Sequence, residues 1–396
     1  MKKMFRLLFL VISINSAICV CGQEREMPII AFWGVPEGKT MDVEFQRFKE
    51  CGFTVSLYPY KSLEALIRAC RCADKYGVKI IGSCPELVKT PTRAAQALKK
   101  ENGFFGYQIQ DEPNVTEIPQ RQKEIEKLKD VDSTHLFYIN LLPFQKNDPQ
   151  WVTSVTKAPT YQDYLRIASK TSCQQISFDH YPITTKGLRD TWYHNLEMIR
   201  QESLKSNKPF WGFVLSVPHV DYPQPTMGAL RLQVYSNLAY GAQAIQYFTY
   251  WTPANNKKYD FHDAPISSDG KKTKTYALVQ QMNSELKSIA QLFYGAKILS
   301  VHHLGVIAEG TSRQTQNPEN ISSFKIVGKR GALLSRFEKN GRRYLAIVNK
   351  DYKEKMTVLL ETKNNIPCHI TKKLQEEKLQ KSYRVSAGDI LLVRLK

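Results

Sequence analysis

Between residues 29 and 253 the sequence repeats one unit: a short apolar segment, a polar loop, and a segment whose apolar residues have helical spacing. Strands that alternate with helices join through right-handed crossovers into parallel sheets. Eight such units predict an α/β fold of the closed (β/α)₈ type, the TIM barrel. The predicted strands are residues 29–35, 54–58, 79–84, 104–110, 135–142, 175–180, 210–217 and 244–251.

An open, doubly wound sheet is the alternative for the same alternation. Such sheets usually bind nucleotides through a Gly-rich loop after the first strand. Here the segment after that strand reads GVPEGKTMD, which has neither the G-x-G-x-x-G pattern nor the complete spacing of a P-loop. The closed barrel is therefore the better prediction, and we expect no cofactor.

The pattern changes after residues 271–294, which carry the apolar stripe of a last barrel helix. Short β-type runs follow, separated by charged or Gly/Asn turns, as in a small antiparallel sandwich. We therefore predict a barrel at residues 23–296 and a C-terminal β-sandwich at residues 297–396.

Residues 1–22 have the three parts of a cleavable export signal. A basic start precedes a short apolar run, and Val20 and Gly22 take the small-residue positions before a cleavage site at Gln23. Cys19 and Cys21 leave lipoprotein anchoring as a less favoured alternative, because the residues directly before them are not small. The mature protein is expected to be periplasmic or secreted, without a membrane span.

The formal net charge of +19 is the one unusual bulk property. Such a charge suits a nucleic acid, a membrane surface or a polyanionic substrate. Basic and acidic residues are interleaved, as in KEIEKLK at 123–129, and no basic block is longer than a few residues. Nucleic acid is therefore not an expected partner, and an acidic glycan is favoured over it.

Metal-binding patterns do not occur in the sequence. The six cysteines after the export signal follow no metal or disulfide spacing. His302 and His303 are adjacent in a predicted strand, so their side chains face opposite ways. No metal site is expected.

The carboxyl ends of the predicted strands are rich in polar and aromatic residues, and a (β/α)₈ barrel builds its active site at these ends. Aromatic rings beside carboxylates and amides suit a pyranose, whose C–H faces stack while its hydroxyls take hydrogen bonds. Core packing is the alternative for the aromatic residues, and a buried structural role for the histidine. The predicted substrate-binding residues are Trp33, Tyr58, Glu86, Asp111, Asn140, His180, Tyr181, Tyr250 and Trp251.

The segment FFGYQIQDEPN at 104–114 ends a strand abruptly at two carboxylates and a proline. It resembles the Asn-Glu-Pro acid/base segment of the large retaining clan of (β/α)₈ glycoside hydrolases. FDHYP at 178–182, the run QVYSNLAYGAQAIQYFTYWTP and the β-rich tail extend this resemblance over most of the mature chain. The resemblance implies that Glu112 is the acid/base and that Asp111 stands where the clan has Asn. A solvated loop start is the alternative.

The clan's nucleophilic Glu at the end of the seventh strand has no counterpart in FWGFVLSVPH. Asp179, which ends the sixth strand, is the best remaining partner for Glu112, with Glu86 and Asp263 as rivals. A gap of roughly 6.5 to 9.5 Å between the carboxylates would suit an inverting hydrolase, with Glu112 as general acid and Asp179 as general base. We therefore expect a glycoside hydrolase acting on an oligosaccharide or polysaccharide. A barrel that only binds carbohydrate, having lost its nucleophile, is the alternative.

Overall fold

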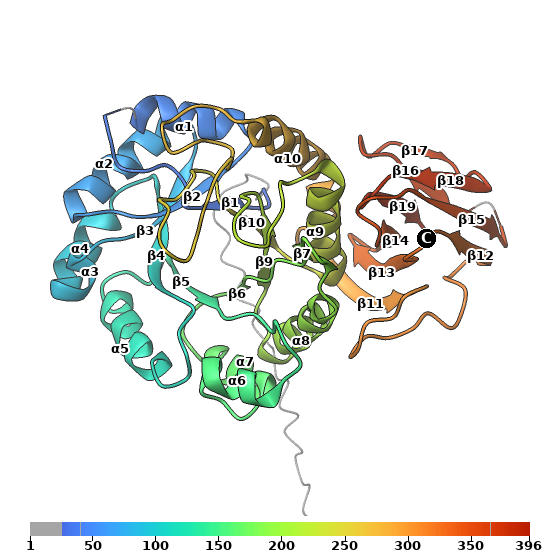
Figure 1. Cartoon of the computed structure of the whole chain (residues 1–396), viewed down its shortest axis with the longest axis horizontal. Helices are drawn as coiled ribbons and strands as arrows, with labels where there is room; N and C mark the ends of the chain where they lie inside the picture. The colour runs from blue at the N-terminus through green and yellow to red at the C-terminus, as the bar shows by residue number, and fades with distance from the viewer. Residues whose placement is uncertain (1–25, 40, 365) are drawn as a thin grey trace, which may run out of the picture.

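The structure is a computed structural model and describes residues 26–39, 41–364 and 366–396. The predicted export signal at 1–22 lies outside these residues. Figure 1 shows two parts, a closed barrel ringed by helices and a smaller all-β part beside it.

Eight parallel strands close into a barrel, which confirms the predicted fold class. Their order around the barrel is β1-β10-β9-β6-β5-β4-β3-β2. Each predicted strand has its counterpart at the expected place in the chain. The barrel strands are β1 (Ile29–Phe32), β2 (Val55–Pro59), β3 (Lys79–Ser83), β4 (Phe104–Asp111), β5 (Leu136–Leu141), β6 (Ile176–Phe178), β9 (Phe210–Leu215) and β10 (Ala244–Phe248).

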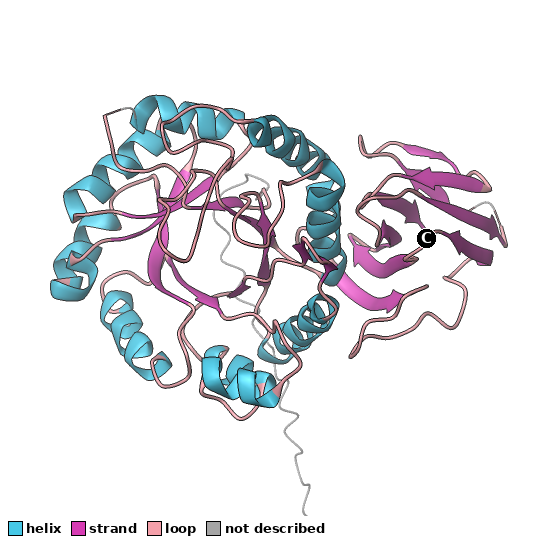
Figure 2. Cartoon of the chain, viewed as in Figure 1, coloured by secondary structure: helices cyan, strands magenta, loops and turns pink. Residues whose placement is uncertain are grey.

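Helices surround the barrel on its outside, as Figure 2 shows. In the second helix, the Ser62 hydroxyl accepts a hydrogen bond from the Ala65 N–H at the N-terminus, and Leu66, Ala69 and Cys70 are buried on one face. The helices are α1 (Met41–Glu50), α2 (Leu63–Asp74), α3 (Glu86–Lys89), α4 (Pro91–Leu98), α5 (Ile118–Lys129), α6 (Pro149–Thr156), α7 (Tyr161–Ala168), α8 (Thr191–Ser206), α9 (Met227–Tyr240) and α10 (Lys274–Phe293).

Two apolar cores keep the barrel rigid. One fills the layer between strands and helices, and the other fills the barrel interior, where Ile30, Leu57, Ile81 and Phe213 are buried. A two-stranded hairpin, β7 (Ile183–Thr184) and β8 (Gly187–Leu188), follows β6. The packed interior leaves the loops at the carboxyl ends of the strands to form the site.

The C-terminal part consists of antiparallel sheets, as predicted. One sheet has the order β11-β13-β14-β19-β16-β17 and the other β12-β15-β18, with Ile321, Leu345 and Val358 in the core that they share. The strands are β11 (Lys297–His303), β12 (Ile321–Val327), β13 (Ala332–Lys339), β14 (Arg342–Asn349), β15 (Met356–Thr362), β16 (Cys368–Ile370), β17 (Glu376–Lys378), β18 (Ser382–Val385) and β19 (Ile390–Arg394).

Helix α9 joins the two parts. It packs on β9 and also on β11, β13 and β14, which is why its residues are buried on every face. Arg231 of α9 pairs with Glu285 of α10 at 2.5 Å, and Lys372 of the C-terminal part reaches both Glu285 and Asp389 at 2.7 Å. Among the described residues, no helix is long and apolar enough to cross a membrane.

Candidate active site

The end of β4 is irregular, and this irregularity selects the side chain that enters the barrel mouth. Gln108 pairs with Tyr138 of β5, but the next pairs are Gln110 with Ile139 and Asp111 with Asn140. The extra residue on β4 is a bulge, which shifts the alternation of side chains by one. Asp111 rather than Gln110 therefore lies opposite Asn140.

Glu112 follows in a left-handed backbone conformation, with φ of 49°. Its N–H donates a hydrogen bond of 2.8 Å to the carbonyl oxygen of Asn140. A left-handed conformation is uncommon outside glycine and collects at functional sites. Three more residues in the loops after barrel strands share it, namely Trp33, Val220 and Asp263.

Asn140 joins the carboxylates of two strands. Its Nδ2 donates hydrogen bonds of 3.1 Å to Asp111 Oδ1 and 3.0 Å to Asp179 Oδ1. Glu112 follows Asp111 directly in the chain, and both Asp111 and Asp179 act on its titration. The mouth of the barrel therefore holds a cluster of three acidic groups around one amide.

Buried polar groups below the cluster orient the Asn140 amide. Tyr138 donates to Gln246 Oε1 at 2.8 Å, Gln246 Nε2 donates to Ser177 Oγ at 2.8 Å, and Ser177 donates to Asn140 Oδ1 at 2.9 Å. Because Asn140 Oδ1 accepts from below, its Nδ2 must point up at the two carboxylates. This network fixes the geometry of the cluster before any ligand enters.

The cluster shifts the titration of its members. Desolvation and the Asp111 charge raise the pKa of Glu112 to about 7, against the lowering effects of Asp179 and Lys258. Desolvation and the Glu112 and Asp111 charges raise the pKa of Asp179 well above its usual range. Asp111 and Glu112 are open to water at the mouth, but the surrounding strands remove part of their hydration. Like charges in one cluster oppose the ionisation of one another, which is why the pKa values of Glu112 and Asp179 are both raised.

Glu112 and Asp179 belong to one cluster, since each acts on the titration of the other. The gap of roughly 6.5 to 9.5 Å between their carboxyls stays a prediction. The bulge and the left-handed turn of β4 bring Glu112 inward, and neither is visible in a simple count of strands.

Two residues after Asp179 differ in their surroundings. Tyr181 acts to lower the pKa of Asp179, and its ring stacks on that of Phe248 with centroids 5.6 Å apart. His180 is 1% exposed and donates from Nδ1 to Asn195 Oδ1 at 3.0 Å. Burial lowers its pKa to about 3, so the ring is neutral. His180 therefore fits the structural role better than substrate contact, whereas Tyr181 belongs to the acidic cluster.

The predicted aromatic residues divide between the mouth and the outer core. Trp33 and Tyr58 form an edge-to-face pair with centroids 5.5 Å apart, and both are partly exposed. The prediction for Tyr250 is wrong, because its ring is 0% exposed and packs edge-on against Phe48 and Phe53 in the layer between strands and helices. A strand that ends in adjacent aromatic residues cannot direct all of them into the mouth.

Trp251 is partly buried and lies against the loop before α10 rather than in the barrel interior. Its ring is in van der Waals reach of Gly270. Its backbone N–H donates to the carbonyl oxygen of Trp33 at 2.9 Å. The residue holds two mouth loops together, and its role as a substrate contact remains a prediction.

The rival carboxylates lie elsewhere. Glu86 Oε2 accepts a hydrogen bond of 3.0 Å from the Leu63 N–H at the start of α2. Asp263 is exposed in the loop between β10 and α10. At the end of β9, the buried Ser216 donates to the Thr249 carbonyl oxygen at 2.7 Å, and no carboxylate follows it before Asp221. Asp179 lies in the same cluster as Glu112, and its role as the partner carboxylate stays a prediction.

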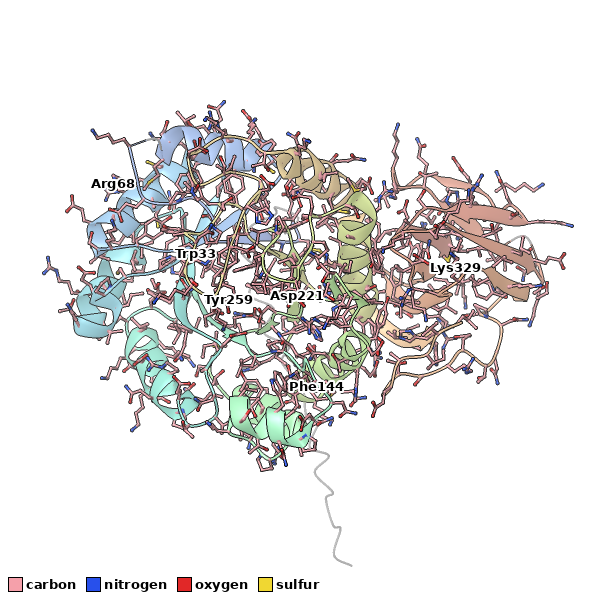
Figure 3. All side chains as sticks on the ribbon, viewed as in Figure 1. Trp33, Arg68, Phe144, Asp221, Tyr259 and Lys329 are labelled. Atoms are coloured by element: carbon pink, nitrogen blue, oxygen red, sulfur yellow. The ribbon has the colours of Figure 1, made fainter. Side chains whose placement is uncertain are left out.

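The loop between β10 and α10 supplies residues that we did not single out. Lys258 acts electrostatically on Glu112, and the ring of Tyr259 lies beside Lys258. In Figure 3, Tyr259 and Trp33 both lie within the outline of the barrel strands. The only signal in the sequence was aromatic residues in an otherwise polar loop, which does not reveal where the loop folds.

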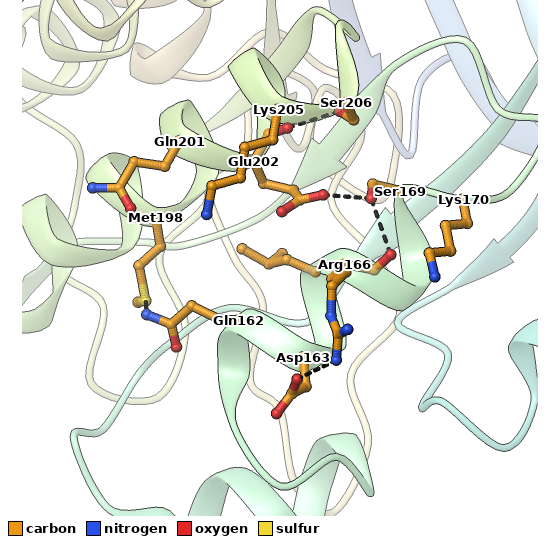
Figure 4. Close-up of a pocket in the computed structure, with 11 residues that line it drawn as sticks. Gln162, Asp163, Arg166, Ser169, Lys170, Met198, Gln201, Glu202, Lys205 and Ser206 are labelled. Carbon is orange, nitrogen blue, oxygen red and sulfur yellow. Dashed lines mark hydrogen bonds and ion pairs between the residues drawn. The ribbon is translucent and has the colours of Figure 1, made fainter.

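A groove lies on the outside of the barrel, between α7 and α8, with a volume of about 620 Å³ (Figure 4). Both of its carboxylates already have partners, since Arg166 pairs with Asp163 and Ser169 donates to Glu202. Within the described residues, no group of three or more His, Cys, Asp or Glu side chains is arranged to hold a metal ion. The mouth remains the better candidate for chemistry.

Comparison with known proteins agrees with this location. Residues 108–289 match the family model described as beta-galactosidase. This segment starts within β4 and ends within α10, so it includes Asp111, Glu112 and Asp179. No curated protein sequence matches the chain significantly.

Solved structures share the fold at low identity. A β-galactosidase from Bacillus circulans sp. alkalophilus has a TM-score of 0.59 at 10% identity, covering 93% of this chain and 98% of that chain. Eubacterium rectale Amy13B has a TM-score of 0.52 at 9% identity, covering 94% of this chain and 95% of that chain. A β-galactosidase from the psychrophilic Marinomonas ef1 has a TM-score of 0.51 at 12% identity, and the match covers 68% of this chain but only 60% of that chain. The match over residues 108–289 and the closed eight-stranded barrel support a (β/α)₈-barrel glycosidase.

Proposed function

We propose that the protein hydrolyses O-glycosidic bonds, with Glu112 as the proton donor and Asp179 as the general base. The observation that carries this proposal is the acidic cluster at the barrel mouth, where Asn140 hydrogen bonds to Asp111 and Asp179 and the pKa of the adjacent Glu112 is raised to about 7. A general acid is most effective when its pKa lies near the working pH. Glycoside hydrolysis needs one protonated and one ionised carboxyl, and a pair that shares a proton provides both.

In the proposed reaction, Glu112 gives its proton to the glycosidic oxygen as the bond to the anomeric carbon breaks. Asp179 takes a proton from a water molecule, whose oxygen forms the new bond to that carbon. Asn140 donates a hydrogen bond to Asp179 and favours its ionised form. This route needs space for a water molecule between the two carboxyls, and Glu112 is exposed to water at the mouth. This route inverts the anomeric configuration.

A non-catalytic barrel that binds carbohydrate is the second candidate. The end of β9 favours it, because Ser216 stands there without a carboxylate. An array of oligosaccharides with product analysis separates the two candidates, and β-galactosides come first because of the family match. Shortened products support the hydrolase, whereas binding without shortening supports the second candidate.

We also propose that the protein is exported and works in the periplasm or outside the cell. The support is the basic start, apolar run and small residues of positions 1–22, with cleavage before Gln23. Mass spectrometry of the mature N-terminus tests this. A chain that keeps residues 1–22, or one acylated at a cysteine, contradicts it.

A further inference from the structure

An aromatic wall closes one side of the mouth. Tyr259 stacks on Phe261 with centroids 5.2 Å apart, and Phe261 packs on His219 at 4.7 Å. His219 in turn contacts Tyr222 at 4.8 Å, and Tyr222 lies edge-on to Tyr181 at 5.8 Å. The wall thus runs from the loop between β10 and α10 to Tyr181, two residues after Asp179.

Backbone hydrogen bonds attach this wall to the barrel. The Val220 N–H donates to Asp260 Oδ1 at 2.6 Å, and the His262 N–H donates to the Pro218 carbonyl oxygen at 3.3 Å. These bonds join the loop after β10 to the loop after β9. The carboxylate of Asp260 is therefore turned toward the Val220 N–H, although it lies only two residues from Lys258.

Lys258 is the cation of this wall. Its side chain is exposed, and its ammonium lies 4.9 Å from the centroid of the Tyr259 ring. No salt bridge to a carboxylate forms at Lys258 among the residues that the structure describes. The nearby charge that acts on it is that of Glu112. When Glu112 is protonated as the acid, Lys258 loses this partner and faces the mouth as an uncompensated cation.

A second cation lies at the far end of the wall. The Arg189 guanidinium donates to the Tyr222 hydroxyl at 3.3 Å and lies 3.6 Å from Asp221 Oδ2. Its carbon Cζ stands 5.6 Å from the centroid of the Tyr222 ring. Its Nε is buried without a hydrogen-bond partner in the described structure. The wall therefore offers stacking surface between two positive groups, which suits a sugar that carries negative charge.

We propose that Lys258 binds a carboxylate or sulfate group of the substrate, so that the mouth takes an acidic glycan. This inference rests on the glycan-binding mouth of the proposed function and does not require turnover. The net charge of +19 also favours an acidic glycan, because it attracts polyanions toward the protein from a distance.

The test measures binding in the Glu112→Gln background, in which turnover is blocked and residue 112 is neutral like the protonated acid. A glycan array presents acidic oligosaccharides beside their carboxyl-reduced and desulfated counterparts. Calorimetry then follows the best binder with Lys258→Met and with Lys257→Met, a matched control that removes the same charge from the neighbouring exposed position.

We expect acidic members to bind more tightly than their neutral counterparts, and added salt to reduce the difference. Lys258→Met should weaken acidic binding about fivefold or more, while Lys257→Met changes it much less. Loss on carboxyl reduction identifies a uronate, and loss on desulfation identifies a sulfated sugar. Equal binding of acidic and neutral members, absence of binding to any acidic member, or equal effects of the two lysine variants would overturn the inference. If the protein binds acidic oligosaccharides but the wild type hydrolyses none of them, the proposed function is wrong and this inference still holds.

Discussion

Asn140 Nδ2 lies 3.0 Å from Asp179 Oδ1 and thereby ties the end of β5 to the end of β6. The same nitrogen donates to Asp111, and the oxygen of the amide accepts from Ser177 below. One side chain therefore connects the packed interior of the barrel to its acidic cluster. The proposed chemistry depends on this connection because it holds Asp179 in place and favours its ionised form.

Replacing Glu112 with Gln should lower kcat by about 10² or more, since general acid catalysis contributes about 10² to 10⁴. The amide has nearly the same shape but cannot donate a proton as an acid does. The measurement is turnover of a substrate that the wild type cleaves. Asp263→Asn is the matched control, because that residue has a left-handed backbone, which Asn tolerates, and an exposed carboxylate.

Two results would contradict this role for Glu112. One is a Glu112→Gln protein that keeps more than about a tenth of the wild-type rate. The other is an equal loss in Asp263→Asn, which would move the chemistry to the loop between β10 and α10. A thermal melt of each variant separates lost chemistry from lost folding.

The pH dependence should follow Glu112. Its pKa in the folded protein is about 7, above the ordinary value of 4.5. Above pH 7 the acid loses its proton, so kcat/KM should fall on the alkaline side. Between pH 4.5 and about pH 7, Glu112 binds more protons in the folded protein than in the unfolded chain. Its contribution to stability therefore falls as pH rises through this range.

Melting temperatures of wild type and Glu112→Gln across pH 4 to 8 measure that contribution. The melting temperature of the variant should rise relative to that of the wild type as pH rises from about 4.5 to about 7. A difference that stays constant over this range, together with a rate that is flat up to pH 8, would show that Glu112 is ionised throughout.

Asn140→Leu should act through Asp179 rather than through substrate contact, because Asn140 is a positioning residue. Losing its hydrogen bond raises the pKa of Asp179 further, since that bond favours the carboxylate. We expect kcat to fall about tenfold or more and the acidic limb of the rate profile to move to higher pH. A fall in rate with an unchanged limb would instead indicate a purely structural role.

The fold followed from patterns that the chain repeats, whereas the site depends on single exceptions to those patterns. The spacing of apolar segments was enough to predict eight strands, because every unit buries its apolar face in the same way. The bulge before Asp111 and the left-handed Glu112 have no signal of that kind. They bring two neighbouring carboxylates into one cluster, although alternation along a strand would separate them.

Aromatic residues show the same limit. Tyr250 and Trp33 are both aromatic residues directly after a strand, yet Tyr250 is buried beside α1 while Trp33 reaches the mouth. The difference arises from packing against helices that are distant in sequence. Lys258 and Tyr259 depend on how a long loop folds back, which hydrogen bonds to the neighbouring loop determine.

The contact between the barrel and the C-terminal part should be sensitive to one methyl group at Gly388. This residue has φ of 65°, and a Cβ there would lie 2.1 Å from the carbonyl oxygen of Gly228 at the start of α9. Gly341 has φ of 74° and nothing within 4 Å of such a Cβ. Both Ala variants carry the backbone strain of a left-handed residue, about 1 kcal/mol, but only Gly388→Ala adds a clash with backbone.

We therefore expect Gly388→Ala to lower the free energy of unfolding by at least about 2 kcal/mol more than Gly341→Ala does. Denaturant titration of both variants gives this difference directly. Because α9 packs on β9 as well as on the C-terminal sheets, the loss should appear in the barrel transition too. Equal losses in the two variants would mean that the contact at Gly228 relaxes without cost. A loss confined to the C-terminal part would mean that α9 does not couple the stability of the barrel to that of the C-terminal part.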